Sequence, residues 1–403
     1  MIVLDMNRLY FAIGLSAFSV FLAGCQKNQP VVETGRRDSG SIEKVSLILS
    51  PFEEDDMQSR TSYDFANRQF LWSEGDAVGI VNEQGGHLKF LIKEDYYGST
   101  KASFDGRGYA LLPGVNYAGY SPFYPDYDLD PTHLPISYKG QVQQGNDDQS
   151  HLGSHSYIAA IGSAPETGSL NFKFKNIGSP HRYNVPVTPG DYTVFRLYVQ
   201  EPKYILEGTI NLMSPDEASL IAIAPVELSN EISLDLTGTT VSEAGILSCW
   251  MMVPPADLSG DIIRMTLTKE DGTVLLAVAP GRDCPANNRR FFYPQSSVSP
   301  ASRDVGSGAG RVEVQVARAS AEVDLTVKSQ VEWLSLSSST TSGLVTTYTF
   351  DVAENNGAER EGTISFTEAS TGLVNTVKVT QKKAGTIIGI GGWDSENRSG
   401  RAN

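Results

Sequence analysis

The stretch LNFKFK, from Leu170 to Lys175, alternates apolar and polar side chains without a break. In an extended strand successive side chains point to opposite faces, so the leucine and both phenylalanines share one face. The asparagine and the lysines share the other. This order is typical of a half-buried antiparallel strand with one face on a core and one in water. The sequence therefore predicts a strand here.

Short runs of the same kind recur along the chain, separated by Gly, Pro, Asn and Asp. No long segment has the 3.6-residue period of an amphipathic helix. We therefore predict an all-β chain built of β-sandwiches. The other runs that support this prediction are Val45–Ser50, Ala77–Val81, Gly108–Leu112, Val194–Val199, Ile232–Leu236 and Ile263–Leu267.

The N-terminal residues are typical of an export signal. Arg8 precedes the apolar run Leu9–Leu22, which is too short to span a bilayer in the mature protein, since roughly 20 apolar residues are needed. The run leads into Leu-Ala-Gly-Cys25, which resembles the bacterial lipobox. This resemblance implies cleavage before Cys25 and attachment of acyl lipid, palmitate included, to that cysteine. The alternative is an ordinary signal peptide followed by a chance cysteine.

Changes in composition divide the chain into segments. GSAPETG at 162–168 is rich in turn formers, and SSVSPASRDVGSGAG at 296–310 has the composition of a flexible linker. We predict a signal peptide over 1–24, a polar tether over 25–42, β-sandwich domains over 43–165 and 166–297, a linker over 298–309, a small β-sandwich over 310–383 and a tail over 384–403.

Charge and motifs disfavour two classes of function. The formal net charge of −15 disfavours nucleic acid as a partner, because both would be polyanions. His151 and His155 are four residues apart, but Leu152 stands where a zinc protease needs glutamate. Asp126, Asp128 and Asp130 alternate without completing a calcium loop. We predict no catalytic residue, metal or cofactor, and hence no enzyme.

A series of motifs in residues 43–297 resembles the fimbrillin-like family of Bacteroidota lipoproteins, in the order that the family has them. The motifs are Arg60–Ser62 (RTS), Phe70–Ile80 (FLWSEGDAVGI), Tyr117–Phe123 (YAGYSPF), Gln141–Asn146 (QVQQGN), Tyr157–Ala160 (YIAA), Leu170–Asn176 (LNFKFKN, the strand that opens the family's second domain) and Cys249–Gly260 (CWMMVPPADLSG). We expect Trp72 to anchor a core, and Gly75-Asp76 to form a turn whose carboxylate accepts backbone N–H groups.

The fimbrillin-like resemblance implies two tandem β-sandwiches, a lipid-anchored position at the outer membrane or cell surface, and a role in adhesion or fimbriae. Family pilins lose their first strand by proteolysis after a basic residue and accept a strand donated by the next subunit. Here Val45–Ser50 is the strand to lose, and Arg60 is the expected cleavage site, with Arg37 as the alternative. Otherwise both arginines simply lie in exposed loops. The implied partners are other fimbrial subunits, glycans or host surface receptors.

Residues 310–383 resemble a BACON domain, a small immunoglobulin-like β-sandwich. The motifs that carry this resemblance are Val331–Leu334 (VEWL), Tyr348–Asn355 (YTFDVAEN), Arg360–Phe366 (REGTISF) and Val377–Gln381 (VKVTQ). The family is named for suspected carbohydrate binding, so a glycan-binding envelope lipoprotein is the alternative function. We expect Trp333 to pack in the core and Tyr348 to alternate with core residues, and this favours a spacer role. A folded module after the second fimbrillin-like domain also favours a tip, anchor or stand-alone adhesin over a shaft subunit.

Two cysteines follow Cys25, namely Cys249 and Cys284, and both lie in predicted strands of one domain. Outside the cytoplasm they can form a disulfide. The alternative is a pair of buried thiols that never meet, and the spacing alone does not decide between the two.

Overall fold

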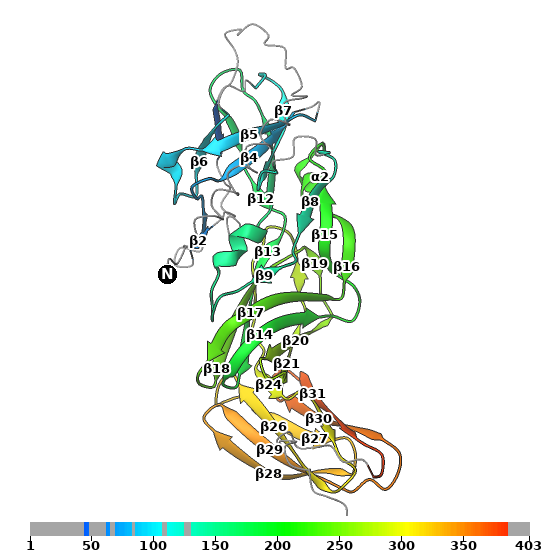
Figure 1. Cartoon of the computed structure of the whole chain (residues 1–403). Helices are drawn as coiled ribbons and strands as arrows, with labels where there is room; N and C mark the ends of the chain where they lie inside the picture. The colour runs from blue at the N-terminus through cyan, green and yellow to red at the C-terminus, as the bar shows by residue number, and fades with distance from the viewer. Residues whose placement is uncertain are drawn as a thin grey trace, which may run out of the picture. The chain divides into compact units, whose positions relative to one another are not determined.

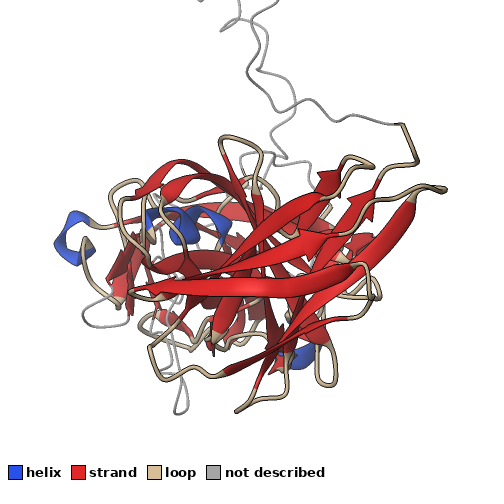
Figure 2. Ribbon diagram, turned by 90° about the horizontal axis from the view of Figure 1, so that it is seen from below, coloured by secondary structure: helices blue, strands red, loops and turns tan. Residues whose placement is uncertain are grey.

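The computed structural model describes residues 44–47, 62–64, 69–82, 85–106, 111–124 and 130–385, all of which belong to one compact unit, Ile42–Asn403. Nearly all of their regular structure is strand (Figure 2), which confirms the predicted all-β class. Among the described residues no helix is long and apolar enough to cross a membrane.

The N-terminal part of the described chain forms an eight-stranded sheet (Figure 1). In spatial order its strands are β11 (Leu170–Phe172), β1 (Lys44–Leu47), β6 (Ala102–Asp105), β5 (His87–Ile92), β4 (Ala77–Val81), β7 (Asn116–Ser121), β10 (Ile158–Ser163) and β12 (Lys175–Asn176). β11 and β12 are neighbours in sequence but lie at opposite ends of this sheet. The sheet therefore folds back on itself and encloses a core.

That first core contains the predicted anchor Trp72, which is 2% exposed and packs edge-on against Phe104 at a ring-centroid distance of 4.7 Å. The predicted turn is present as well. Gly75 has φ +84°, and the Asp76 carboxylate accepts a hydrogen bond from the Ser73 backbone N–H at 2.7 Å, just before β4 begins. Both expectations for this motif are confirmed.

The stretch LNFKFK is extended, but it does not open the second domain as its motif led us to expect. Leu170, Phe172 and Phe174 are buried in the first core, and β11 and β12 hydrogen-bond to β1 and β10. Conversely, β8 (Leu134–Ser137) and β9 (Gln141–Val142), from the predicted first domain, pair with strands further along the chain. The boundary at 165/166 is therefore corrected, because strands on both sides of it cross to the other sheet.

The second core lies between a three-stranded sheet and the central part of a nine-stranded sheet. The three strands are β18 (Gly245–Val253), β13 (Ser179–Val187) and β23 (Arg290–Phe292). The strands that face them are β17 (Glu231–Val241), β14 (Gly190–Tyr198), β20 (Ile262–Lys269) and β21 (Val274–Pro280).

The third core belongs to a smaller sandwich at the C-terminal end. One of its sheets is made of β28 (Leu334–Ser342), β29 (Val345–Val352), β26 (Gly310–Arg318) and β24 (Ser296–Ser299). The other contains β25 (Ser302–Val305), β31 (Val374–Gln381), β30 (Arg360–Glu368) and β27 (Leu325–Ser329). Phe350, Val352, Ile364 and Phe366 are buried, which confirms that these strands turn one face to the core.

The predicted flexible linker is wrong, because residues 296–305 form β24 and β25. β24 pairs with β21 on one side and β26 on the other, so one continuous nine-stranded sheet joins the second core to the third (Figure 1). Ser296 is fully buried, and its hydroxyl donates to the Glu368 carboxylate at 2.7 Å. Small polar residues are used here for close packing between two sheets.

Short elements complete the described fold. They are the hairpin β2 (Ser62–Asp64) and β3 (Gln69–Leu71), the strands β15 (Tyr204–Ile210) and β16 (Ala224–Ser229) beside β8, the pair β19 (Ala256–Asp257) and β22 (Asp283–Cys284), the 3-10 helices η2 (Glu94–Tyr96) and η3 (Ser150–His155), and the helix α2 (Glu217–Leu220).

Candidate functional site

The lipid-attachment and cleavage residues predicted from the sequence, namely Cys25, Arg37 and Arg60, lie outside the described residues, as does most of the 384–403 tail. The strand that cleavage would release is described. β1 lies inside the eight-stranded sheet, antiparallel to β6 and parallel to β11. Its pairs include Val45 with Phe104 of β6 and with Leu170 of β11. Both edges of β1 are therefore occupied.

The two neighbours of β1 line an apolar wall. Phe104, Leu170 and Phe172 are each no more than 1% exposed, and all three belong to the first core. Without β1, the facing edges of β6 and β11 would lose their backbone partners on that side, and the core beneath them would open. Both changes are costly until another strand fills the space, because buried N–H and C=O groups need partners. We call the position between β6 and β11 the β1 slot.

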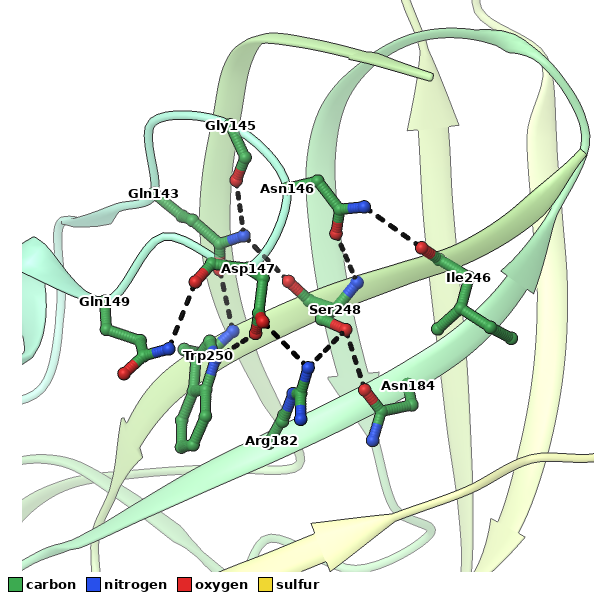
Figure 3. Close-up of polar contacts among 10 residues, drawn as sticks. All are labelled: Gln143, Gly145, Asn146, Asp147, Gln149, Arg182, Asn184, Ile246, Ser248 and Trp250. Atoms are coloured by element: carbon green, nitrogen blue, oxygen red, sulfur yellow. Dashed lines mark hydrogen bonds and ion pairs between the residues drawn. The ribbon is translucent and has the colours of Figure 1, made fainter. Parts of the chain in front are cut away.

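A second sheet edge, that of β18, is sealed in a different way (Figure 3). β18 is an end strand of its sheet, and amide side chains from the segment 141–151 lie along it. The Gln143 amide accepts from Trp250 N–H at 2.7 Å and donates to the Ser248 carbonyl at 2.8 Å. Like a paired strand, this side chain offers one donor and one acceptor to the edge.

The neighbouring residues continue this pattern along β18. The Gln141 amide accepts from Met252 N–H at 2.7 Å and donates to the Met252 carbonyl at 2.8 Å. At the other end, the Asn146 amide accepts from Ser248 N–H and donates to the Ile246 carbonyl. We call Gln141, Gln143 and Asn146 the amide ladder. It satisfies the edge of β18 and leaves no room for an added strand there.

An ion pair holds the ladder segment in place. Asp147 has φ +65°, in the left-handed region, and its carboxylate accepts from Trp250 Nε1–H at 2.7 Å and from Arg182 Nη2–H at 2.9 Å. The Arg182 guanidinium also lies over the Trp250 ring, 5.6 Å from its centroid. Figure 3 shows these groups converging from β13, β18 and the ladder segment. Their role is structural, because every one of these contacts binds one part of the chain to another.

Sequence reasoning singled out the stretch QVQQGN only as a family motif and missed its physical role. The signal was present, since Gln141 and Gln143 alternate with Val142 and so point to one face. Both glutamines are almost fully buried, whereas Val142 is 41% exposed. Alternation that buries the polar residues and exposes the apolar one is the reverse of an ordinary half-buried strand, and buried amides require hydrogen-bond partners.

Cys249 and Cys284 are both buried free thiols, which is the second of the two alternatives. Burial raises the pKa of the Cys284 thiol to about 12 and raises that of Cys249 further. Because the thiolate is the reactive form, neither residue is suited to act as a nucleophile.

The described residues contain no group of three or more His, Cys, Asp or Glu side chains that could hold a metal ion. His151 Nε2–H donates to the Trp250 carbonyl at 3.1 Å, so this side chain extends the seal along β18. Of the three alternating aspartates, Asp126 and Asp128 lie outside the described residues.

The motif residues of the C-terminal module form one hydrogen-bonded cluster. Arg360 donates to the Gln381 side chain at 2.9 Å and lies over the Trp333 ring, 4.5 Å from its centroid. Asn355 holds a turn by donating to the Ala358 and Lys382 carbonyls. Trp333 packs against the core and is covered by Arg360, so the module does not present it as an exposed platform.

The chain is similar to several solved structures of bacterial proteins. Among solved structures it is similar to a "putative cell adhesion protein" from Bacteroides ovatus, with 13% identity and a TM-score of 0.40 over 62% of this chain and 91% of the other. A "putative cell adhesion protein" from Bacteroides eggerthii has 8% identity and a TM-score of 0.31 over 66% and 86%. The C-terminally truncated tip fimbrial protein Mfa3 from Porphyromonas gingivalis has 10% identity and a TM-score of 0.31 over 62% and 94%.

No curated protein matches the sequence. The family model of the BACON domain, described as "Putative binding domain, N-terminal", matches residues 322–382. This stretch contains the Trp333, Asn355, Arg360 and Gln381 cluster and most of the third core. Residues 322–382 are therefore a BACON domain.

Proposed function

We propose that this chain is a fimbrillin-like surface lipoprotein, a non-enzymatic adhesin or an accessory subunit of a fimbria, anchored in the outer membrane through lipid on Cys25. The observation that carries the proposal is the β1 slot. An N-terminal strand that is paired on both edges and is followed in the sequence by an acidic segment with Arg60 has the arrangement that strand exchange between subunits requires. The sealed edge of β18 also supports the proposal, because a donated strand cannot add to that sheet edge.

The C-terminal BACON domain favours a terminal role in an assembly. β24 continues the sheet of the second sandwich directly into the module, so the module is fixed to that sandwich rather than tethered to it. A fixed module occupies the end from which a shaft subunit would donate a strand. We therefore assign the chain to a tip, an anchor or a stand-alone adhesin.

Arginine-specific proteolysis of the purified chain tests the strand-exchange part. We expect cleavage after Arg60, loss of the fragment that contains β1, and recovery of stability on adding a synthetic peptide of residues 43–50. Arg60→Gln should abolish this, whereas Arg37→Gln should not. A chain that stays uncut, or is cut only at Arg37 and keeps β1, contradicts exchange and leaves a stand-alone adhesin.

The lipid anchor has a separate test. In a bacterial host the unchanged chain should fractionate with membranes and carry acyl mass on Cys25, and Cys25→Ser should remove both. Equal fractionation of the two chains would contradict the anchor.

A further inference from the structure

A cleft with a volume of about 600 Å³ lies between the second sandwich and the BACON domain. One wall is the outer face of β14, β20 and β21, and the other is β31. Volumes of this size, at junctions between domains, are typical of small-ligand sites.

The sandwich wall presents an aromatic ring beside a cation. Tyr198 and Arg264 are direct cross-strand partners on β14 and β20, so their side chains share a face. Tyr198 is 37% exposed. Arg264 is exposed too, and within the described part of the chain its side chain has no ion pair and no hydrogen bond. An available guanidinium is notable in a chain with a net charge of −15.

The acidic group in the cleft is already neutralised. Asp261 forms an ion pair with Lys203, whose Nζ lies 2.6 Å from Oδ2 of the aspartate. Arg264 therefore dominates the local charge. A planar guanidinium binds a carboxylate with two parallel hydrogen bonds, which gives direction as well as attraction. Gln200 on one wall and Thr376 on the other supply polar side chains for hydroxyl groups.

The wall made by β14 and β20 offers no free strand edge, because each of these strands has a hydrogen-bonded neighbour on both sides. β21 pairs with β24 only at Leu276 and Ala277, and β31 pairs with β25 only from Lys378 onward. On the wall that carries Tyr198 and Arg264, recognition therefore comes from side chains. A sugar ring suits this arrangement, since its apolar face can stack on tyrosine while its hydroxyl groups reach the polar side chains.

We propose that this cleft binds an acidic saccharide, with Tyr198 stacking on a sugar ring and Arg264 pairing with the sugar carboxylate. The site is shared between the second sandwich and the BACON domain, so the isolated module would lack half of it. It supplies a ligand class for the proposed adhesin. It does not depend on strand exchange, because it is complete in the uncut chain.

The test uses the uncut full chain and two ligands that differ only at C6, methyl β-D-glucuronide and methyl β-D-glucoside, with binding followed by saturation-transfer NMR and titration. The glucuronide should bind at least about tenfold more tightly, because the charged hydrogen bonds are lost with the glucoside. Arg264→Gln should remove that difference, and Tyr198→Ala should weaken both ligands. Arg311→Gln, on the exposed face of the module, is the matched control.

Arg264 and Tyr198 are exposed, so their variants should retain the melting temperature of the unchanged chain, and this is checked first. Equal binding of both ligands, no binding of either at about 10 mM, or equal losses in Arg264→Gln and Arg311→Gln would each overturn the proposal. The strand-exchange proposal is tested separately, by proteolysis. A negative result for either proposal therefore does not affect the other.

Discussion

The amide ladder makes a quantitative prediction at Gln143. Leucine is one bond shorter than glutamine and has no polar atoms, so Gln143→Leu keeps most of the space filled while it removes the hydrogen bonds. The Trp250 amide loses its acceptor, and the Gly145 carbonyl loses its donor. The Ser248 carbonyl loses one donor but keeps Asp147 N–H at 3.2 Å.

The expected cost follows from these losses. Gln143 is fully buried, so water does not replace its bonds. A buried polar group that loses its partner lowers the free energy of unfolding by roughly 1–3 kcal/mol. The two groups together lower it by about 3 kcal/mol if one of them finds a new partner by a small local shift. At about 1.4 kcal/mol for each factor of ten, the opening of the β18 edge becomes roughly a hundredfold more frequent.

Hydrogen exchange measured by mass spectrometry on a peptide covering 246–253 reports this opening directly. Gln144→Leu is the matched control, because Gln144 is the adjacent glutamine, is exposed, and its side chain makes no hydrogen bond within the described residues. We expect about a hundredfold faster exchange in Gln143→Leu and little change in Gln144→Leu. If the two variants exchange within about threefold of one another, the amide ladder does not hold the edge, and the reasoning is refuted.

Three further predictions follow from the same structure. Gly362→Ala should lower the free energy of unfolding of the BACON domain by about 1–3 kcal/mol, because a Cβ there would meet Val331 Cγ2 at 2.6 Å and Trp333 Cζ2 at 2.8 Å. Gly357→Ala is the control and should have only a small effect, since its nearest atom lies at 3.6 Å. Equal effects of the two variants in chemical unfolding would contradict the packing. Burial lowers the pKa of His181 to about 3, so the unfolded chain binds this proton more readily between about pH 6.5 and 3, and stability should fall on acidification. His181→Phe should flatten that part of the profile of unfolding free energy against pH, and an unchanged slope would count against a buried neutral imidazole. The double variant Gln141→Leu, Gln143→Leu should associate through the opened edge of β18 in size-exclusion chromatography, and a strictly monomeric variant would show that the edge stays covered.

Features that depend on neighbouring residues in the chain could be predicted from the sequence. The buried face of Tyr348–Val352 follows from alternation, because side-chain direction in a strand is set by the backbone alone. The Asp76 turn follows for a similar reason, since its bond to Ser73 closes over three residues. Such interactions are local, and local composition encodes them.

Features that depend on distant partners could not be predicted. Ser296 and Ser297 have linker composition, but their hydroxyls bond to Glu368 and Pro186, which are 72 and 111 positions away. The Gln143 amide bonds to residues more than 100 positions along the chain. A serine or glutamine is polar in any setting, and only the fold determines whether its partner is water or a buried backbone group.

The β1 slot, on which the proposed function depends, is another feature made by distant partners. The run Val45–Ser50 is recognisable as a strand, but its pairing with β6 and β11 through Lys44–Leu47 depends on residues far along the chain. Backbone hydrogen bonds do not distinguish a strand of the same chain from one donated by a neighbour. What distinguishes them is the covalent connection through residues 48–61, which gives the chain's own strand a high effective concentration. Cutting that connection lowers the effective concentration without changing the slot. Under the proposed function, a single cleavage in this segment would therefore distinguish a stand-alone adhesin from an assembling subunit, and this is why Arg60 rather than any residue of the slot is the position to test.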